Sequence, residues 1–555
     1  RAWLCGPIGE DPPMAVRDLG QAERLAAQAL AEPSRTFAIQ YLNGALAEVD
    51  DPLPGVRNDG LLATHELREG VRLRRDWKAA CERSRSLVNL RDRALVEGLG
   101  YCIEQRGDHA VLRAADGEEI RAVAVFLDRG ERPDRPSARF DQRTPVTHAL
   151  TLADREGLRW VVAVRGSTLR LYSTATSGAA GQRGRTETFV ELDLPLLADE
   201  HAGYLSLLFA ADALAAGGTF DEIATASRDF TTSLSERMRE RIYERTVPDL
   251  ALAIARNHDG PLDKTALDAI YHAALTVLFR LLFVAYAEDQ RLLPYAASED
   301  YRANSLKALA QRFAGRINAG EPLGFADPFS ASAPATPGDR TDELWSRCRA
   351  LFQAVDKGNN GWDIPPYNGG LFSANSPEGR RIASLTLTNA EFGAALAALV
   401  LDRTPDGGVG PIDFRSLSVR EFGSIYEGLL ENELAVAEVD LSLRMDSKLQ
   451  AEVYVPAGSG ETIFVTEGDV YLHDKSGARK SSGSYFTPEF AVDRLIEAAI
   501  GPPLTQHLEK VAALADAGDD VQAAAMLLDF RVADIAMGSG HFLTAAVDAI
   551  EAAVT

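Results

Sequence analysis

Two hydrophobic periods divide this chain, and they predict different elements in different stretches. Between residues 101 and 194, apolar residues form short runs bounded by Gly, Pro and charged residues, which is the pattern of β-strands. Gly166-Ser167 lies between two of these runs and has the composition of a hairpin turn. Helical spacing predicts helices at 87–99 and 146–155 beside them. The expected strands are 101–105, 110–113, 120–127, 160–164, 169–172 and 189–194.

The period becomes helical between residues 201 and 435. Residues 233–255 are charged and amphipathic, whereas 267–288 are strongly apolar, with Leu278, Leu281, Leu282 and Ala285 on one helical face. Such a face predicts the core of a helix bundle. An Ala- and Leu-rich helix is also expected near the start of the chain, at 21–31. Residues 440–480 return to β-prone runs, at 453–455, 463–465 and 470–472.

Composition is typical of a globular protein and limits the classes of partner that we expect. Of its 555 residues, 46% are hydrophobic and 25% are charged, which is enough apolar material for several cores. No apolar run approaches the roughly 20 residues of a membrane span, so no membrane partner is expected. The four Cys residues are scattered without metal-type pairs, which predicts a reducing cytoplasm and no metal site. A net charge of −23 argues against a nucleic-acid surface over the whole molecule.

The candidate chemistry lies near the end of the sequence. Residues 530–533 are short and largely apolar and end at Asp534, which predicts a strand. Gly538 and Gly540 follow and allow a ligand to approach the main chain, before a helical pattern begins. A strand, a Gly-rich loop and a helix present free N–H groups, as nucleotide-binding folds do. Leu543 stands where a dinucleotide motif needs Gly, and the phosphate-cradling loop motif is absent too.

A second motif precedes this loop. Residues 482–488 read Ser-Gly-Ser-Tyr-Phe-Thr-Pro, and Pro488 keeps Thr487 out of the α region. A helix is expected next, at 490–499, and packing of an aromatic loop on that helix would be a purely structural role for the motif. In their order and spacing, however, the two motifs resemble motifs X and I of the γ-class amino-methyltransferases that modify adenine in DNA.

This resemblance implies a Rossmann-like class I methyltransferase domain that contacts S-adenosyl-L-methionine through both motifs. The sequence departs from the family at Ile535, where Pro is usual, and at Met537, where Cys or Gly is common. The implied reaction is methyl transfer to N6 of adenine in double-stranded DNA, with the target base flipped out of the duplex. The cofactor-contacting residues that the resemblance implies are Tyr485, Phe486, Thr487, Pro488, Asp534, Ala536, Gly538, Ser539, Gly540 and Phe542.

The expected hairpin at 160–172 resembles one in the N-terminal nuclease-like domains of type IIG restriction–modification enzymes. Active nucleases of that kind hold a metal with an Asp and an E-x-K on adjacent strands. No E-x-K is present in this region, so we expect a nuclease-like fold that does not cut DNA. The acids weighed as metal ligands are Asp116, Glu118, Glu119 and Asp128, with Arg121 where a Lys would stand.

Three further segments, at 278–294, 366–372 and 422–431, resemble large restriction-type adenine methylases, and we expect them to be structural. Together these patterns predict a mixed α/β multidomain protein. Its expected parts are an N-terminal segment at 1–80, a nuclease-like α/β domain at 81–200, a helical connector at 201–435, a β-hairpin linker at 436–480 and the start of the methyltransferase domain at 481–555.

Catalytic residues are not expected within the sequence. The family places an N/D-P-P-Y/F motif after the Gly-rich loop, so we expect it to follow residue 555. Residues 11–14 read Asp-Pro-Pro-Met, but Met lacks the aromatic face that stacks on a flipped base. The favoured function is a site-specific adenine methyltransferase of a bacterial restriction–modification or phage-defence system such as BREX or DISARM, with other defence proteins as possible partners. Two alternatives stay open: a single-chain enzyme with an active nuclease, and a non-catalytic DNA- or partner-binding scaffold with a regulatory cofactor site.

Overall fold

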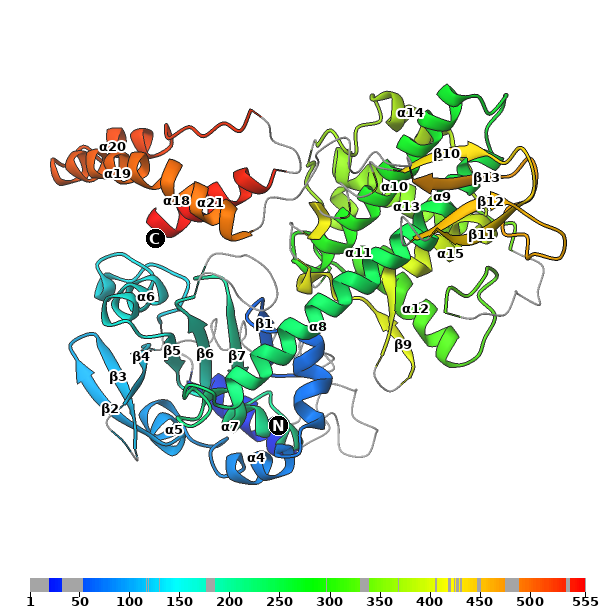
Figure 1. Cartoon of the computed structure of the whole chain (residues 1–555). Helices are drawn as coiled ribbons and strands as arrows, with labels where there is room; N and C mark the ends of the chain where they lie inside the picture. Colours follow the sequence, from blue (N-terminus) through cyan, green and yellow to red (C-terminus); the bar gives the residue numbers. More distant parts are fainter. Residues whose placement is uncertain are drawn as a thin grey trace. The chain divides into compact units, whose positions relative to one another are not determined.

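The computed structural model of the chain is shown in Figure 1. Contacts divide the chain into two compact units, Arg1–Ser233 with Ser416–Val419 and Pro488–Thr555, and Leu234–Arg415 with Arg420–Thr487. The structure describes residues 19–31, 53–115, 117, 119–128, 130–175, 185–295, 297–329, 339–367, 369–404, 407–417, 421–423, 425, 429, 432–446, 451–474, 489–535 and 540–554.

A seven-stranded sheet forms the centre of the first unit, so the expected mixed α/β class is confirmed. The strand order is β1-β7-β6-β5-β4-β3-β2, and all neighbours are antiparallel except β4 and β5. α6 (Pro145–Glu156) connects this parallel pair, since parallel neighbours need a crossover connection. The strands are β1 (Val56–Asp59), β2 (Tyr101–Arg106), β3 (His109–Ala114), β4 (Ile120–Phe126), β5 (Trp160–Arg165), β6 (Thr168–Ser173) and β7 (Phe189–Asp193).

Strands β2 to β7 confirm the six predicted runs to within one residue at each end. Gly166-Ser167 forms the predicted turn between β5 and β6, with Gly166 at φ +59°. Asp92 holds this turn, because its backbone N–H donates to the Gly166 carbonyl and its carboxylate accepts from the Gly166 N–H, both at 2.8 Å. Asp92 also begins α5 (Asp92–Gly98), which is shorter than the helix predicted at 87–99.

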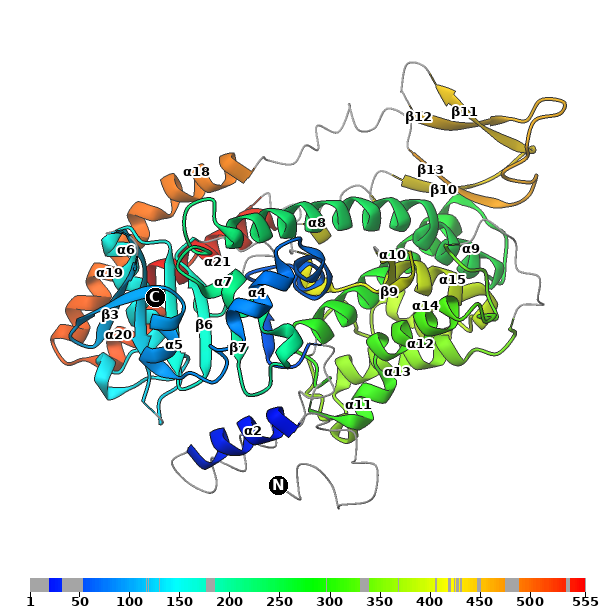
Figure 2. The same cartoon turned by 90° about the horizontal axis from the view of Figure 1, so that it is seen from below.

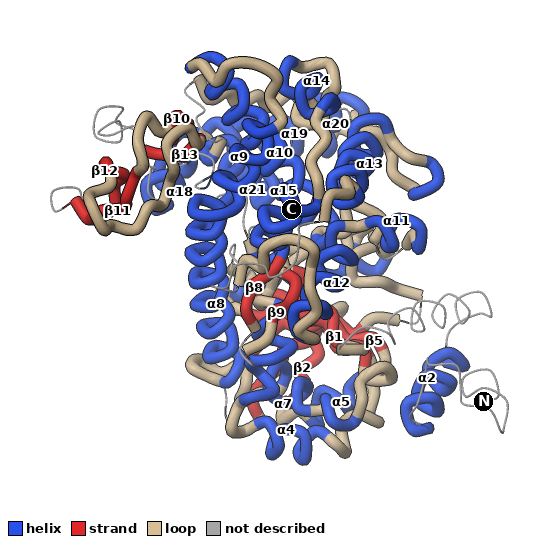
Figure 3. The backbone as a smooth tube through the Cα atoms, turned by 90° about the vertical axis from the view of Figure 1, so that its right-hand side faces the viewer, coloured by secondary structure: helices blue, strands red, loops and turns tan. Residues whose placement is uncertain are grey.

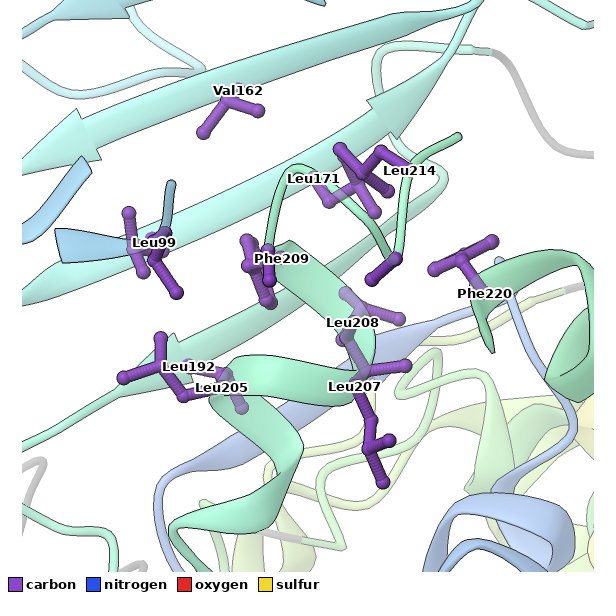
Figure 4. Packing of buried hydrophobic residues seen from close by; sticks show 14 of the residues in the cluster. Leu99, Val162, Leu171, Leu192, Leu205, Leu207, Leu208, Phe209, Leu214 and Phe220 are labelled. Carbon is purple, nitrogen blue, oxygen red and sulfur yellow. The ribbon is translucent and has the colours of Figure 1, made fainter. Parts of the chain in front are cut away.

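Both faces of the sheet are covered by helices. Figure 4 shows Leu171 and Leu192 of the sheet on the side of Leu205 and Phe209 from α7 (Gly203–Phe209), all of them in one buried cluster. α4 (Trp77–Ser84) and α5 contribute to the same cluster. The core therefore extends beyond the expected range of 81–200 on both sides, from Leu53 to Ala224.

The opposite face packs on α6 and on Phe140 from the short turn at Ala138–Phe140. Val123, Val125 and Val161 alternate along their strands with residues of the first cluster and contact Val146 and Leu150 of this helix. Thr144 caps α6 by accepting the Thr147 N–H, Pro145 occupies its first turn, and Gly157 at φ +65° ends it. Burial on both faces explains why these strands read as nearly continuous apolar runs.

Helices make up most of the second unit, as expected for 201–435 (Figures 2 and 3). The amphipathic stretch at 233–255 is interrupted by a π-helical turn at Ile242–Thr246. α8 crosses from the first unit into the second, and α2 near the start of the chain confirms the helix expected at 21–31. The helices are α2 (Leu19–Ala31), α8 (Thr219–Arg241), α9 (Val247–Arg256), α10 (Lys264–Asp289), α11 (Glu299–Asn304), α12 (Leu306–Asn318), α13 (Glu343–Lys357), α14 (Pro377–Ser384) and α15 (Asn389–Val400).

α10 is the most apolar of the long helices that the structure describes. By length and composition it could span a membrane, but 67% of its most apolar stretch is buried within the protein. Burial of this kind is expected for a core helix of a bundle. The predicted bundle face is confirmed, since Leu278, Leu281, Leu282 and Ala285 are all buried.

Three two-stranded sheets complete the second unit. The predicted runs 453–455 and 470–472 lie in strands, whereas 463–465 does not and makes only a single bridge, from Val465 to Leu441. Ile463 and Phe464 are more than half exposed, and only Val465 of this stretch is buried, beside Leu441 and Ala437. The strands are β8 (Leu401–Arg403), β9 (Val409–Pro411), β10 (Asn432–Val436), β11 (Leu441–Asp446), β12 (Ala451–Pro456) and β13 (Val470–Asp474).

Because both faces of the sheet are buried, we expect the truncation of one core side chain to lower the free energy of unfolding substantially. Phe209→Ala removes a fully buried ring between α7 and the sheet, and the cavity should lower the free energy of unfolding by about 3–5 kcal/mol. Urea denaturation followed by circular dichroism measures this loss. The control Leu73→Ala, at a side chain 75% exposed, should change stability by less than about 0.5 kcal/mol. Similar losses for both variants would contradict the described packing.

Candidate functional site

The described C-terminal residues form a small helical cluster. Its helices are α18 (Glu489–Ala499), α19 (Gly501–Asp516), α20 (Asp520–Leu527) and α21 (His541–Val554). Val492 and Ile496 of α18 pack against Ala546 of α21, with Phe542 and Ile550 beside them. Figures 1 and 2 both show α18 and α21 side by side and running in the same direction. The N-termini of the two helices, which follow the two motifs in sequence, therefore lie at the same end of the pair.

Three of the ten expected cofactor-contacting residues lie in the described part of the chain. Asp534 is partly buried, Gly540 directly precedes α21, and Phe542 packs into the α18–α21 cluster from the first turn of α21. The other seven lie outside the described residues: Tyr485, Phe486, Thr487, Pro488, Ala536, Gly538 and Ser539.

Gly540 has the backbone geometry that the sequence predicts for a ligand-approach position. Its φ is +83°, in the region that favours glycine, and its carbonyl accepts the Thr544 N–H at 3.0 Å to start α21. Among the residues that the structure describes, no atom lies within 4 Å of a Cβ atom built at Gly540.

The strand predicted at 530–533 is wrong. No strand is present among the described residues of the C-terminal segment, and 531–534 have no regular structure. Val532 is 37% exposed and Ile535 is fully exposed. A strand exists only when a neighbour supplies hydrogen-bond partners, and none of the described residues pairs with this stretch.

The three segments that resemble large adenine methylases meet on α10 in the second unit. Tyr367 and Phe372 pack against Phe283 from one loop. From the other segment, Phe422 packs against Tyr286, and the Leu429 carbonyl accepts a hydrogen bond from the Tyr271 hydroxyl at 2.5 Å. The expected structural role of these segments agrees with this packing in the residues that are described, which exclude 368, 424, 426–428, 430 and 431.

Two neighbouring carboxylates at the end of α10 are almost fully buried, and the sequence reading missed them. Glu288 accepts hydrogen bonds from the Tyr301 hydroxyl at 2.7 Å and from the backbone N–H groups of Leu306 at 2.9 Å and Lys307 at 2.8 Å. Asp289 accepts from the Lys307 ammonium at 2.7 Å and from the Phe414 N–H at 2.8 Å. An acidic pair directly after a long apolar helix was the available signal.

The geometry of this pair explains its burial. Glu288 satisfies two N–H groups of the first turn of α12, which have no partner within that helix. Burial raises the pKa of Glu288 to about 7, although its three hydrogen bonds favour the ionised form. Burial also raises the pKa of Asp289, opposed by the Lys307 ammonium. Because every carboxylate oxygen of the pair is engaged, we interpret the pair as a structural link between α10, α12 and residue 414.

The two described acids of the expected nuclease site, Glu119 and Asp128, lie at opposite ends of β4. Glu119 precedes β4 and pairs with Arg121 at 2.5 Å, while Asp128 follows β4, is 79% exposed and lies 3.6 Å from Arg139. Between them β4 carries only apolar residues and Arg121. Asp116 and Glu118 lie outside the described residues.

Comparisons with protein-family models, with curated proteins and with solved structures gave no match to this chain. Any assignment of function therefore depends on the motifs and geometry described above.

The raised pKa of Glu288 predicts a pH-dependent contribution to stability. Because the folded pKa of about 7 lies above the ordinary 4.5, this contribution is fully present below pH 4.5 and is lost as the pH rises through 7. The loss is on the order of 3 kcal/mol. Glu288→Gln cannot titrate, so the stability of the wild type relative to this variant should fall between pH 5 and 8 in urea titrations.

Tyr301→Phe provides the matched test of this assignment. It removes one hydrogen bond that favours the ionised carboxylate, so the pH at which the contribution is lost should move upward. Parallel stability profiles for the wild type and Glu288→Gln across this pH range would contradict the assignment.

Proposed function

We propose that the chain is part of a DNA adenine-N6 methyltransferase and that its C-terminal segment binds S-adenosyl-L-methionine. The two motifs provide the first support, through their order and their G-S-G-x-F core. The observation that carries the proposal is the parallel packing of α18 and α21, with N-termini at the same end. Two motifs that are distant in sequence thereby lead into one helix pair from the same side.

The described residues fit such a cofactor at Gly540. A glycine at positive φ lets a ligand approach closely, and the N-terminus of α21 directs free N–H groups toward it. A helix N-terminus favours negatively charged groups, so we assign it to the carboxylate end of the cofactor. Asp534 would bind the amino group by its opposite charge. When bound, the cofactor supplies a methyl group activated by its sulfonium sulfur.

The remaining candidate residues have roles that follow from their chemistry. Tyr485 and Phe486 would cover the cofactor with apolar ring faces that exclude water. A ring face also attracts a neighbouring cation, which suits a sulfonium group. After Gly540 the sequence contains no N/D-P-P-Y/F motif, so we assign these residues to cofactor binding and name no base-contacting residue.

We also propose that the sheet of the first unit is a nuclease-like domain and that double-stranded DNA is the partner of the protein. The crossover through α6 between parallel β4 and β5, inside an otherwise antiparallel sheet, supports the first point. The packing of three segments on α10 supports a connector that links such a domain to a methylase. Cytoplasmic bacterial defence, by restriction–modification or a related system, is the biological setting that these proposals imply.

Binding of S-adenosyl-L-methionine is the part of the proposed function that can be measured directly. Equilibrium dialysis of the chain with radiolabelled S-adenosyl-L-methionine should give saturable binding that S-adenosylhomocysteine competes. Gly540→Ala places a Cβ on a backbone at φ +83°, which disfavours this conformation by about 1 kcal/mol or more and fills the approach path. Binding should weaken at least tenfold.

Gly460→Ala is the matched control. Gly460 has φ +86°, and a Cβ built there also meets no described atom within 4 Å, but it lies in a turn of the second unit. This variant should suffer the same backbone strain and bind the cofactor as the wild type does. Absence of any saturable binding by the wild type, or equal losses in both variants, would overturn the proposal.

A further inference from the structure

Asp108, His109 and His148 form a compact cluster in the first unit, and none of them belongs to the candidate sites considered above. The imidazole and carboxylate atoms that could bind a metal all lie within 4.8 Å of one another. It is the only such group of three or more His, Cys, Asp or Glu side chains among the residues that the structure describes. No local pattern in the sequence indicates this cluster, because its members come from the β2–β3 hairpin and from α6.

Local structure explains how these side chains come together. β2 and β3 pair up to Arg106 and His109, which leaves Gly107 and Asp108 as a two-residue turn. Gly107 takes φ +67° at the first turn position, where the favoured hairpin turns need a glycine. Asp108 and His109 therefore stand at the end of the hairpin. His148 extends toward them from α6, whose position is set by the buried neighbours Ala149 and Leu150.

Distances between these atoms match those around a bound metal. Asp108 Oδ1 lies 3.0 Å from His109 Nδ1, and Asp108 Oδ2 lies 3.0 Å from His148 Nε2. Adjacent ligand atoms bound at 2.0–2.2 Å are about 2.8–3.1 Å apart in octahedral geometry and about 3.3–3.6 Å apart in tetrahedral geometry. In the absence of a metal, His109 Nδ1 can donate a hydrogen bond to Asp108 Oδ1. His148 lies at the same distance from the other oxygen of that carboxylate.

His148 Nε2 is buried and lies 3.0 Å from Asp108 Oδ2. Phe140 packs beside its ring, with centroids 5.3 Å apart. Arg106 at the same turn does not neutralise Asp108, because it pairs with Glu104 and Glu156. Two imidazole nitrogens that lie 3.0 Å from the two oxygens of one carboxylate, all within reach of a single ion, have the arrangement of a metal-ligand set.

We propose that Asp108, His109 and His148 bind one divalent transition-metal ion of the Zn²⁺ class. Two imidazoles and one carboxylate suit Zn²⁺, Co²⁺ or Fe²⁺, whereas Mg²⁺ and Ca²⁺ prefer oxygen ligands throughout. Three protein ligands leave at least one coordination position for water, as in catalytic rather than structural zinc sites. The ion also links the β2–β3 hairpin to α6 across the edge of the sheet. Glu119 and Asp128 take no part.

Metal titration of the full chain, prepared without a histidine tag and stripped with a chelator, tests the proposal. Zn²⁺ should bind with one-to-one stoichiometry and raise the melting temperature, because the ion binds only the folded site. Co²⁺ should give the visible absorption of a nitrogen- and oxygen-ligated centre, without the intense charge-transfer band of a thiolate. His148→Gln and Asp108→Asn should each weaken binding at least tenfold.

Two controls make the outcome decisive. His272→Gln changes an exposed histidine on α10, and Cys102→Ser removes an exposed thiol on β2, and neither should alter the affinity. If the His148 variant fails to fold, the test depends on Asp108→Asn, which changes a partly exposed turn position. The affinity and the Co²⁺ spectrum of that variant are then compared with those of the wild type. No stoichiometric binding by the wild type, or equal binding by the wild type and Asp108→Asn, would overturn the site and leave adventitious metal only.

Discussion

Burial of both faces of the seven-stranded sheet is the constraint on which the first unit depends. Strands such as β5 are buried along nearly their whole length, so each face must be covered by a helix layer. α4, α5 and α7 cover one face and α6 the other. Because α6 must also connect two parallel strands, its position is determined twice, by connectivity and by packing. That position brings His148 to the end of the β2–β3 hairpin.

The second unit also has an apolar element that must be covered on all sides, and here that element is a helix. α10 is apolar on most of its surface, so its neighbours must surround it, and the segments at 366–372 and 422–429 contribute to that layer. Surrounding a helix also removes water from its ends. Glu288 and Asp289 supply the acceptors that water would otherwise provide to α12 and to the Phe414 N–H. The raised pKa of Glu288 is the electrostatic consequence of that arrangement.

The sequence predicted what local patterns determine and missed what distant residues determine. Six strands were predictable because a short apolar run and bounding turn or charged residues agreed at each. β1 was not, since Val56-Arg57-Asn58-Asp59 lacks an apolar run and becomes a strand only through the edge of β7. At 530–533 the apolar pattern was present without a described partner, and no strand forms. Of the candidate cofactor site, the glycine geometry at Gly540 was predictable, whereas the α18–α21 packing and the Asp108–His109–His148 cluster require the fold.

Both proposed sites use residues at the ends of elements that are held by contacts along their length. Gly540 precedes a helix held by the Phe542 and Ala546 contacts, and Asp108 lies in a turn between two paired strands. The stability of each element comes from its sides, while its end remains available to a ligand. Substitutions at the ends should therefore change binding with little loss of folding, and truncations such as Phe209→Ala should do the reverse. Residues that bind a ligand and residues that form the core can therefore be different sets, because they occupy different parts of the same element.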